Sequence, residues 1–465
     1  MPLIFPSNTL SAGGYTVDNS CRFDSGSSAY LSRTLGTPTN NKIWTYSLWV
    51  KNCAIGDGNS TLLSTASDAS YIYFRPDDAD PTPYGFSVES TGNYQFIPLM
   101  TFKDPLAYYH ICIAVDTTQA TEADRTKLYI NGSQITSFTS GKETYPSQDL
   151  DTSVNSAVAH KIGGFASGTN LDAYLSEVVF IDGTQYAASD FGEFDSDSPT
   201  IWKPKDVSDL TFGDNGFYLD FKDSSALGND VSGNDNDFTE SGLAATDQCT
   251  DSPTNNFATF NPLFPVSGDT LSEGNVKVQT SDSNYSPSSS SIGVASGKWY
   301  AEVKYTAQSS VAALIVGVTS NPSEDARNDD YIGEQSYSYG YNSANGESYT
   351  GGSGTSYGDS FAVDDIIGIA LNLDDNELIF YKNGTVQNSG TALSITAAAS
   401  TTSGFYYFAV ADTTTNYNIT AEINFGNPSF TGTDQDDDNG YGSFEYDPPS
   451  GFLALCTKNL GSDGG

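Results

Sequence analysis

The chain has 465 residues, and its 58 Asp and Glu against 19 Lys and Arg give a formal net charge of −39. Nucleic-acid recognition needs Lys and Arg to displace the phosphate counterions, so this charge excludes a nucleic-acid binder and disfavours contact with an anionic membrane. Hydrophobic residues make up 37% of the chain, below the roughly 45–50% of an average domain, so we expect folded domains with thin cores.

No segment predicts a membrane span or an export signal. The chain has no run of about 18 apolar residues, and its start lacks a basic region and is broken by Pro2 and Pro6. The five cysteines are far apart and never form a Cys-x-x-Cys pair: Cys21, Cys53, Cys112, Cys249 and Cys456. This pattern disfavours a disulfide framework and a zinc site, so we expect reduced thiols and assembly inside a cell.

In the first half of the chain the apolar segments are short, β-branched or aromatic, and bounded by Gly, Asn, Asp, Ser or Pro. This punctuation is typical of an all-β chain. It predicts strands over residues 108–115, 127–130 and 175–181. Asn131-Gly132 follows the second of these and predicts a type I′ hairpin, because both residues tolerate positive φ. Strand character ends over residues 191–199, so we place a domain boundary near Asp195.

The second half repeats the pattern after a polar stretch. Residues 196–274 predict an extended connector with one strand possible over 217–221. From Asn275 onward, strands are predicted over residues 299–304, 314–318, 365–373 and 405–410. Asn383-Gly384 predicts a second hairpin. The predicted order is thus an N-terminal arm (1–20), a first domain (21–195), the connector, a second domain (275–450) and a C-terminal tail (451–465).

Segments of both domains resemble known families. The first domain carries, in order, YLS (30–32), YSLWVK (46–51), YYHICIAVD (108–116), KLYINGSQI (127–135) and KIGGF…LDAYLSEVVFIDG (161–183). Over about residues 21–185 it resembles laminin-G-like, concanavalin-type jelly rolls. The second domain carries SGKWYAEVKY (296–305), LIVGVTSN (314–321) and DDIIGIALNLDDNELIFYKNGT (364–385), and it resembles a SPRY domain. These resemblances imply two β-sandwich domains that bind glycans and proteins, respectively, rather than catalyse.

The tandem also resembles virion proteins of tailed bacteriophages, through DFKDSSALGNDVSGNDNDF (220–238) and GFLALCTKNL (451–460). This resemblance implies a tail-fibre, spike or head-decoration protein of the virion, assembled in the host cytoplasm. Its expected partners are other virion proteins, further copies of the chain in a trimer, and a host-surface glycan or protein. The arm, apolar at Leu3, Ile4 and Phe5, is predicted to dock on a neighbouring subunit. Two alternatives are a polysaccharide depolymerase of a phage tail and a secreted bacterial adhesin.

Catalytic patterns are present only in fragments. Glycan hydrolysis needs two carboxylates about 5–10 Å apart, and the nearest match, Glu193 with Asp195 and Asp197, lies outside any predicted strand. The Gly-x-Ser-x-Gly pattern at 354–358 lacks the strand and helix that a nucleophile elbow needs. The chain has two histidines, His110 and His160, and both are predicted to be structural. Glu177, Glu302 and Glu422 are predicted to face solvent from half-buried strands. We therefore expect no catalytic residue and no enzyme.

Two segments predict binding sites. Asp434, Asp436 and Asp438 alternate before Gly440, with Glu445 at the twelfth position, which suits Ca²⁺; a solvated acidic turn is the alternative. A weaker oxygen cluster comprises Asp230, Asn234, Asp235 and Asp237. The Gly/Ser-rich stretch 337–358 carries five tyrosines that either stack on sugars and anchor a partner or fill the rim of a sandwich: Tyr337, Tyr339, Tyr341, Tyr349 and Tyr357.

Overall fold

The computed structural model describes residues 14–54, 60–66, 69–75, 84–165, 170–264, 268–430 and 433–463. It divides into two compact units, the first at Leu10–Thr254 and the second built on Asn255–Gly465. The predicted all-β fold is confirmed, because antiparallel sheets form a β-sandwich in each unit. Most of the predicted N-terminal arm, residues 1–13, lies outside the described residues.

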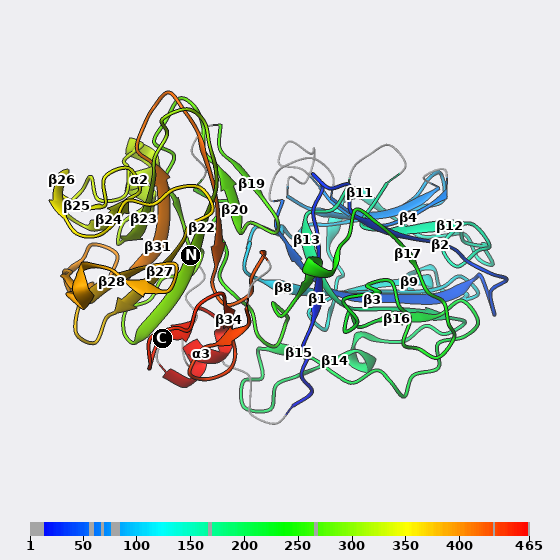
Figure 1. Cartoon of the computed structure of the whole chain (residues 1–465). Coiled ribbons are helices and arrows are strands. Elements are labelled where there is room, and N and C mark those ends of the chain that lie inside the picture. The colour runs from blue at the N-terminus through cyan, green and yellow to red at the C-terminus, as the bar shows by residue number, and fades with distance from the viewer. Residues whose placement is uncertain are drawn as a thin grey trace. The chain divides into compact units, whose positions relative to one another are not determined.

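Two sheets form the first unit. The β3 sheet contains β1 (Ser20–Phe23), β3 (Ile43–Asn52), β8 (Tyr108–Asp116), β9 (Thr126–Ile130), β10 (Ser133–Gln134), β13 (Ala173–Asp182), β16 (Phe217–Leu219) and β18 (Gln248–Cys249). The β5 sheet contains β2 (Tyr30–Thr34), β4 (Ser60–Thr65), β5 (Ser70–Phe74), β6 (Phe86–Ser90), β7 (Tyr94–Pro98), β11 (Phe138–Thr144), β12 (Ala159–Ile162) and β17 (Thr239–Ser241). Figure 1 shows the two sheets stacked as layers.

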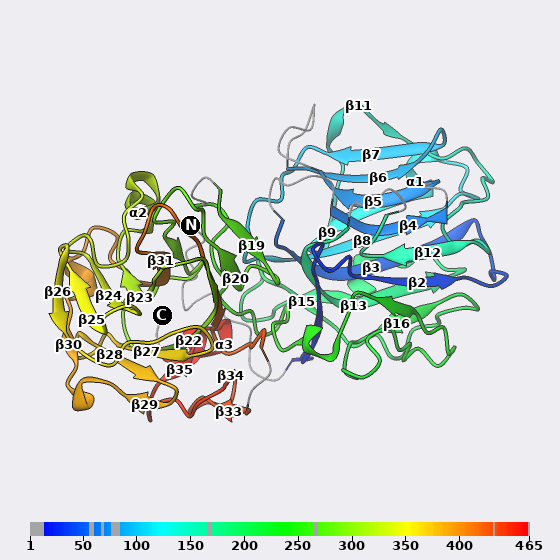
Figure 2. The same cartoon turned by 45° about the horizontal axis from the view of Figure 1, so that its top comes forward.

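The order of strands is β10-β9-β8-β3-β13-β1-β18 in the β3 sheet, where β16 also pairs with β13. In the β5 sheet it is β11-β7-β6-β5-β4-β12-β2-β17, and Figure 2 shows most of these strands side by side. The remaining elements are α1 (Glu122–Arg125), the 3₁₀ turns Ala188–Asp190 and Ala245–Asp247, and the hairpin of β14 (Gly192–Phe194) and β15 (Trp202–Pro204).

The main core of this unit lies between its two sheets. Alternate residues of β3, such as Trp44 and Leu48, join Ile72 and Phe74 of β5 in one buried cluster. The opposite face of the β3 sheet is covered as well: Val179 and Ile181 of β13 pack with residues that follow in the chain, Phe191, Val207 and Phe212. Burial on both faces explains why β13 is apolar at four successive positions, residues 178–181.

The predicted connector differs from the structure. Its first part supplies β15, β16, β17 and β18, which pair with β14, β13, β2 and β1 of the first unit. The strand possible over 217–221 is confirmed as β16. These strands have two or three residues each, so their sequences carry no alternation that a local pattern could detect. The division between the units therefore falls at Thr254, not near Asp195.

The second unit also has two sheets. The β22 sheet contains β19 (Thr270–Ser272), β20 (Lys277–Gln279), β22 (Lys298–Gln308), β27 (Ile366–Asn372), β28 (Glu377–Lys382), β29 (Thr385–Val386), β30 (Leu393–Ser394), β32 (Ile419–Asn424) and β35 (Leu453–Ala454). The β23 sheet contains β21 (Ser288–Ser289), β23 (Leu314–Thr319), β24 (Ser338–Asn342), β25 (Glu347–Thr350), β26 (Ser353–Ser356) and β31 (Tyr407–Asp412). Outside them lie α2 (Pro322–Asn328), α3 (Thr457–Asp463), the 3₁₀ turns Asn388–Gly390 and Ala398–Ser400, and the hairpin of β33 (Gln435–Asp436) and β34 (Ser443–Phe444).

The C-terminal segment belongs to this fold and is not a separate tail. β35 pairs in parallel with β22, at Trp299 and Leu453. On the outer face of the β22 sheet, Phe452, Ala454 and Cys456 pack against Tyr300. All five cysteines of the chain are buried free thiols, as predicted.

Both predicted hairpins are confirmed. Asn131 and Gly132 have φ of 47° and 76°, and Asn383 and Gly384 have φ of 47° and 74°. Positive φ at both central residues is the type I′ geometry that matches the twist of the flanking strands. In addition, a Cβ atom at position 132 would clash with the indole of Trp202.

Gly132→Ala is therefore expected to destabilise the first unit by more than the strain of positive φ alone, which costs about 1–3 kcal/mol. Gly92→Ala is the matched control, because Gly92 has φ of 75° but open space around its Cα. Urea unfolding of both variants measures the difference. Equal losses of stability would show that the indole contact contributes nothing.

Candidate functional site

His110 forms a buried network whose hydrogen bonds fix its tautomer. Trp202 Nε1 lies 3.0 Å from His110 Nδ1, and Ser47 Oγ lies 2.9 Å from His110 Nε2. An indole N–H only donates, so Nδ1 accepts and Nε2 carries the proton that it gives to Ser47. Burial also lowers the pKa of His110 to about 3. Because Nε2 already carries a proton, His110 cannot take one from Ser47. The pair therefore does not act as a serine nucleophile with a histidine base.

His160 is also structural. It lies in β12, 3% exposed, where burial lowers its pKa to about 4 and Nδ1 is 2.9 Å from the Val158 carbonyl oxygen.

The five tyrosines of 337–357 do not form an exposed loop. Tyr339 and Tyr341 lie in β24, Tyr349 lies in β25, and Tyr357 follows β26. Tyr339, Tyr341 and Tyr357 are at most 8% exposed, whereas Tyr337 and Tyr349 are half-buried. Tyr341 and Tyr357 pack against each other and against Phe380. For Tyr339, Tyr341 and Tyr357 the structure therefore matches the second alternative, tyrosines that fill the sandwich.

The acidic segment does not assemble the predicted calcium ligands. Asp434, Asp436 and Asp438 are exposed, and among the described residues no group of three acidic, His or Cys side chains could hold a metal ion. Asp438 accepts the Gly451 N–H at 2.6 Å, and Glu445 accepts the Thr433 N–H at 3.0 Å. The segment instead closes a turn against the C-terminal residues.

The carboxylate that organises this turn is Asp437, which the alternating pattern passed over. It is 4% exposed. It accepts N–H groups of Tyr441 and Ala454, each at 2.8 Å, and the side-chain amide of Asn459 at 2.6 Å. Since its oxygens are occupied by donors of the chain, Asp437 has a structural role.

The weaker oxygen cluster is likewise part of the fold. Asp230 accepts the backbone N–H groups of Tyr218 and Asn236 at 2.8 and 2.9 Å, and Asp237 accepts the N–H of Asp230 at 2.9 Å. Asn234 donates to the carbonyl oxygens of Gly213 and Gly216.

Two of the three carboxylates compared above with a hydrolase pair, Glu193 and Asp195, form ion pairs. Asp195, 1% exposed, and Glu193 lie 3.3 and 3.5 Å from Lys203 Nζ across the β14–β15 hairpin.

Two of the three strand glutamates predicted to face solvent are buried. Glu177 is 6% exposed and lies at a β-bulge of β13, where its φ is 50°. Burial raises its pKa to about 7, although Tyr218 and Tyr15 donate to it at 2.7 and 3.1 Å. Glu302 is 0% exposed, and burial raises its pKa to about 7 while it accepts two backbone N–H groups. Alternation fails at Glu177 because the bulge turns the side chain.

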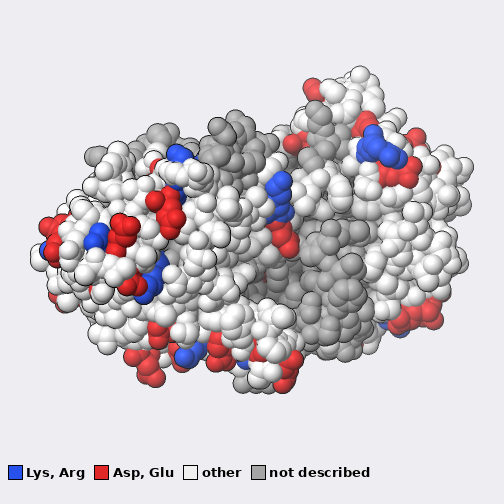
Figure 3. Space-filling model, turned by 180° about the vertical axis from the view of Figure 1, so that it is seen from behind, with Lys and Arg blue, Asp and Glu red and all other residues white. Residues whose placement is uncertain are grey.

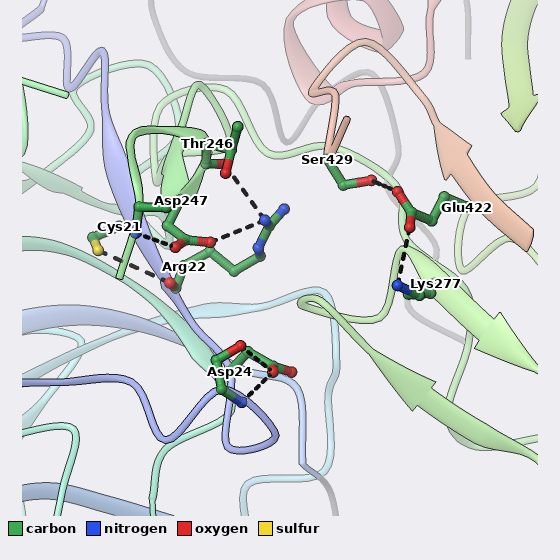
Figure 4. A network of polar contacts seen from close by, with 10 residues as sticks. Cys21, Arg22, Asp24, Thr246, Asp247, Lys277, Glu422 and Ser429 are labelled. Carbon is green, nitrogen blue, oxygen red and sulfur yellow. Dashed lines mark hydrogen bonds and ion pairs between the residues drawn. The ribbon is translucent and has the colours of Figure 1, made fainter. Parts of the chain in front are cut away.

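The third glutamate, Glu422, is half-buried and forms an ion pair with Lys277 at 3.1 Å (Figure 4).

A polar aromatic surface that sequence reasoning missed lies on the outer side of the β5 sheet. We call it the tyrosine–glutamate face: Tyr71 and Tyr73 of β5, Ser87 and Glu89 of β6, and Gln95 of β7. Tyr71, Glu89 and Gln95 are adjacent across the three strands, and Tyr73 is opposite Ser87. Their neighbours Ile72, Phe74 and Val88 point into the core, so these side chains point away from it. Figure 2 shows the three strands side by side.

Glu89 holds the hydroxyls of this face in place. Tyr71 and Tyr73 donate to it at 3.0 and 3.1 Å, and Ser87 donates as well. Burial opposes ionisation of Glu89, but hydrogen bonds from Ser87, Gln95 and the two tyrosines outweigh it and lower its pKa. The hydroxyl protons of both tyrosines are thus directed at Glu89, which fixes the orientation of the two phenols.

The face continues toward further aromatic and basic groups. The rings of Tyr71 and Tyr73 are 5.3 Å apart, and Phe165 meets Tyr71 edge-on at 5.4 Å. Beyond β4 in the same sheet, Nζ of Lys161 in β12 lies 4.2 Å from the ring centroid of Tyr30 in β2. Tyr71, Glu89 and Gln95 are half-buried, whereas Tyr73 is only 9% exposed and Ser87 is 0% exposed, so the accessible part of the face consists of the first three. Aromatic rings beside oriented hydrogen-bonding groups suit a ligand with both apolar faces and hydroxyls, as in sugars.

On the side that Figure 3 presents, Asp and Glu stand in small groups, several beside a Lys or Arg, and are separated by uncharged surface. Within the described part of the chain, no helix has the length and apolar character to span a membrane.

A family model matches part of each unit. The model of the Concanavalin A-like lectin/glucanases superfamily matches residues 24–188, and the model of the SPRY domain matches residues 298–428. The comparison with curated proteins found no match.

Three solved structures are similar to parts of the chain. The SPRY domain of human HERC1 has 20% identity over 35% of this chain and 96% of that one, with a TM-score of 0.29. Stonustoxin has 17% identity over 36% of this chain and 27% of that one, with a TM-score of 0.27. A proposed carbohydrate binding protein from Bacteroides ovatus ATCC 8483 has 17% identity over 49% of this chain and 58% of that one, with a TM-score of 0.34.

Proposed function

Because the chain contains a concanavalin A-like lectin/laminin-G domain followed by a SPRY domain, we propose that it is a binding protein that holds a glycan on the tyrosine–glutamate face and a protein on its SPRY unit. The observation that supports glycan binding is that hydrogen bonds to Glu89 hold Tyr71 and Tyr73 in place. Groups held before the ligand arrives lose less conformational entropy on binding.

Binding is favoured over hydrolysis by the chemistry of this face. A glycosidase needs two carboxyl groups, one of them a general acid with a raised pKa. Among the five residues that define the face, Glu89 is the only carboxylate, and its pKa is lowered. It accepts hydrogen bonds from Ser87, Tyr71 and Tyr73. Such a group stays ionised and cannot protonate a leaving oxygen.

Tyr71→Ala is expected to weaken glycan binding by about 1–2 kcal/mol, roughly 5- to 30-fold, because an aromatic anchor is lost. Glu89→Gln should weaken it as well, since the amide cannot accept all the hydrogen bonds that orient the phenols. Tyr441→Ala is the matched control, an exposed tyrosine of the second unit. A glycan array followed by calorimetry on the best glycan measures these effects. Unchanged binding by Tyr71→Ala would place any glycan site elsewhere.

The biological setting that we propose is a tailed-phage particle. The chain would be a virion component, assembled in the host cytoplasm, that contacts other virion proteins and further copies of itself, with a trimer as the expected form. The support is the resemblance of residues 220–238 and 451–460 to virion proteins. Cryo-electron microscopy of particles from a phage that encodes the chain tests this proposal. Particles without density for the two sandwiches would contradict it.

A further inference from the structure

The second unit contains a polar hollow that is separate from the tyrosine–glutamate face of the first unit. It has a volume of about 410 Å³ and is lined by Gly268, Gln279, Thr280, Ser281, Asp282, Ser283, Asn284 and Asn418. Ligand pockets generally have about 300–1,000 Å³ and a largely apolar lining. The size therefore fits a ligand site, but hydroxyl, amide and carboxylate groups replace the usual apolar wall.

Hydrogen bonds hold the wall in place. Thr280 Oγ1 accepts the Ile419 N–H at 2.9 Å, and the Thr280 N–H donates to the Ile419 carbonyl at 3.0 Å. Ser281 donates its N–H to Asp269 Oδ1 at 2.9 Å, and Asn418 donates its N–H to Ser309 at 2.8 Å. The segment after β20 is thus tied to β32 and to the residue that precedes β19. Walls held in this way are formed before a ligand binds.

The side chains that face the hollow offer acceptors and negative charge. The side-chain amides of Gln279 and Asn418 make no hydrogen bond with the described residues, and Asp282 accepts only from Ser283 Oγ, at 3.1 Å. Behind the wall, Asp269 Oδ2 is buried without a hydrogen bond to the described residues, and burial together with Asp329 raises the pKa of Asp269.

Positive charge is missing on the described residues that line the hollow, since none is Lys, Arg or His. Lys277 lies two residues before Gln279 on the same side of β20, but Glu422 holds it at 3.1 Å, and Ser429 donates to the same carboxylate (Figure 4). The hollow therefore disfavours anions and favours a cation with many hydrogen-bond donors.

We propose that this hollow receives an arginine side chain of a protein partner. A guanidinium has five N–H donors in a planar fork and is always charged. It matches the acceptors of Gln279, Asp282 and Asn418 better than a neutral sugar does, because the lining has no aromatic ring on which a sugar could stack. The inference rests on the proposal that the second unit, which contains the SPRY match, binds a protein. It does not depend on glycan binding by the tyrosine–glutamate face.

Calorimetry with the full chain and capped pentapeptides Gly-Gly-Xaa-Gly-Gly tests the assignment. We expect the arginine peptide to bind more tightly than the glutamine peptide, and the glutamate peptide to bind least. Asp282→Asn should weaken the arginine peptide at least fivefold, and Asn418→Ala should weaken it to a smaller extent. Asp359→Asn is the matched control, because it removes the same charge from an exposed residue of the same unit outside the hollow.

The outcomes separate this inference from the proposed function. Equal effects of Asp282→Asn and Asp359→Asn would overturn it and leave the SPRY unit as a protein-binding domain with its site elsewhere. Equal binding of the arginine and glutamine peptides would also overturn it, as would no binding of any peptide. Loss of glycan binding in Tyr71→Ala would have no bearing on it.

Discussion

Lys51→Met should lower the free energy of unfolding of the first unit by about 3–5 kcal/mol, because it leaves a buried carboxylate without its counter-charge. Lys51 Nζ lies 2.7 Å from Asp251 Oδ2, and the two side chains are 0% and 1% exposed. The ring of Tyr174 lies 5.4 Å from the same ammonium, and Tyr108 donates to the Asp251 carbonyl oxygen at 2.8 Å. Ions this deeply buried are poorly solvated, so each depends on the other.

Two further variants make this expectation specific. Lys127→Met removes a partly exposed ion pair, with Asp124 at 3.4 Å, and should cost only about 0–1 kcal/mol. The double variant Lys51→Met with Asp251→Leu should recover most of the loss, since no buried charge remains. Hydrogen exchange of β3 and β13 under urea reports on the first unit alone. Similar losses for Lys51→Met and Lys127→Met would mean that the buried pair contributes no more than a surface pair.

The second large effect concerns the pH dependence of stability. Glu177 has a folded-state pKa of about 7, against about 4.3 in an unfolded chain. Below pH 4 it is protonated in both states. As the pH rises toward 7, the unfolded state loses this proton before the folded state does. The contribution of Glu177 to folding stability therefore falls progressively, and at pH values above the folded-state pKa it is lost completely.

Glu177→Gln should remove this dependence. The amide oxygen of glutamine can accept from Tyr218 and Tyr15 as the carboxylate does, so we expect the fold to remain. Relative to wild type, the variant should gain about 3 kcal/mol of stability between about pH 4 and pH 8. Glu302, with the same raised pKa, is present in both proteins and cancels. Parallel stability profiles of the two proteins across this range would show that Glu177 titrates normally in the folded state.

Local features were predictable from the sequence. The turns at Asn131-Gly132 and Asn383-Gly384 need only two residues with positive φ, and a strand such as β8 is recognisable from its own composition. By contrast, β17 has the polar sequence Thr-Glu-Ser and is a strand because it pairs with β2, some two hundred residues earlier. No local pattern contains that pairing.

The candidate site illustrates the same limit. The alternation in SYIYF of β5 places Tyr71 and Tyr73 on one side of a strand, and this much could have been inferred. Which carboxylate lies beside them depends on the register between β5 and β6, where Tyr71 is opposite Glu89. For the tyrosines of 337–357, the sequence left a ligand platform and the filling of a sandwich as alternatives. Gly and Ser are frequent in turns, whereas here they lie in the paired strands β24 and β26, and only that pairing decides which tyrosines are buried.

The return of β18 to the edge of β1 has a consequence for biosynthesis. β1 pairs with β13 at Leu175 on one side and with β18 at Cys249 on the other, so two of its neighbours are translated long after it. Non-local pairing of this kind gives a high contact order and slow folding. While the ribosome makes the intervening residues, β1 must wait with its hydrogen-bonding groups unpaired. Nascent chains arrested before residue 248 should therefore be sensitive to protease and bound by chaperones, whereas chains released after residue 254 become resistant.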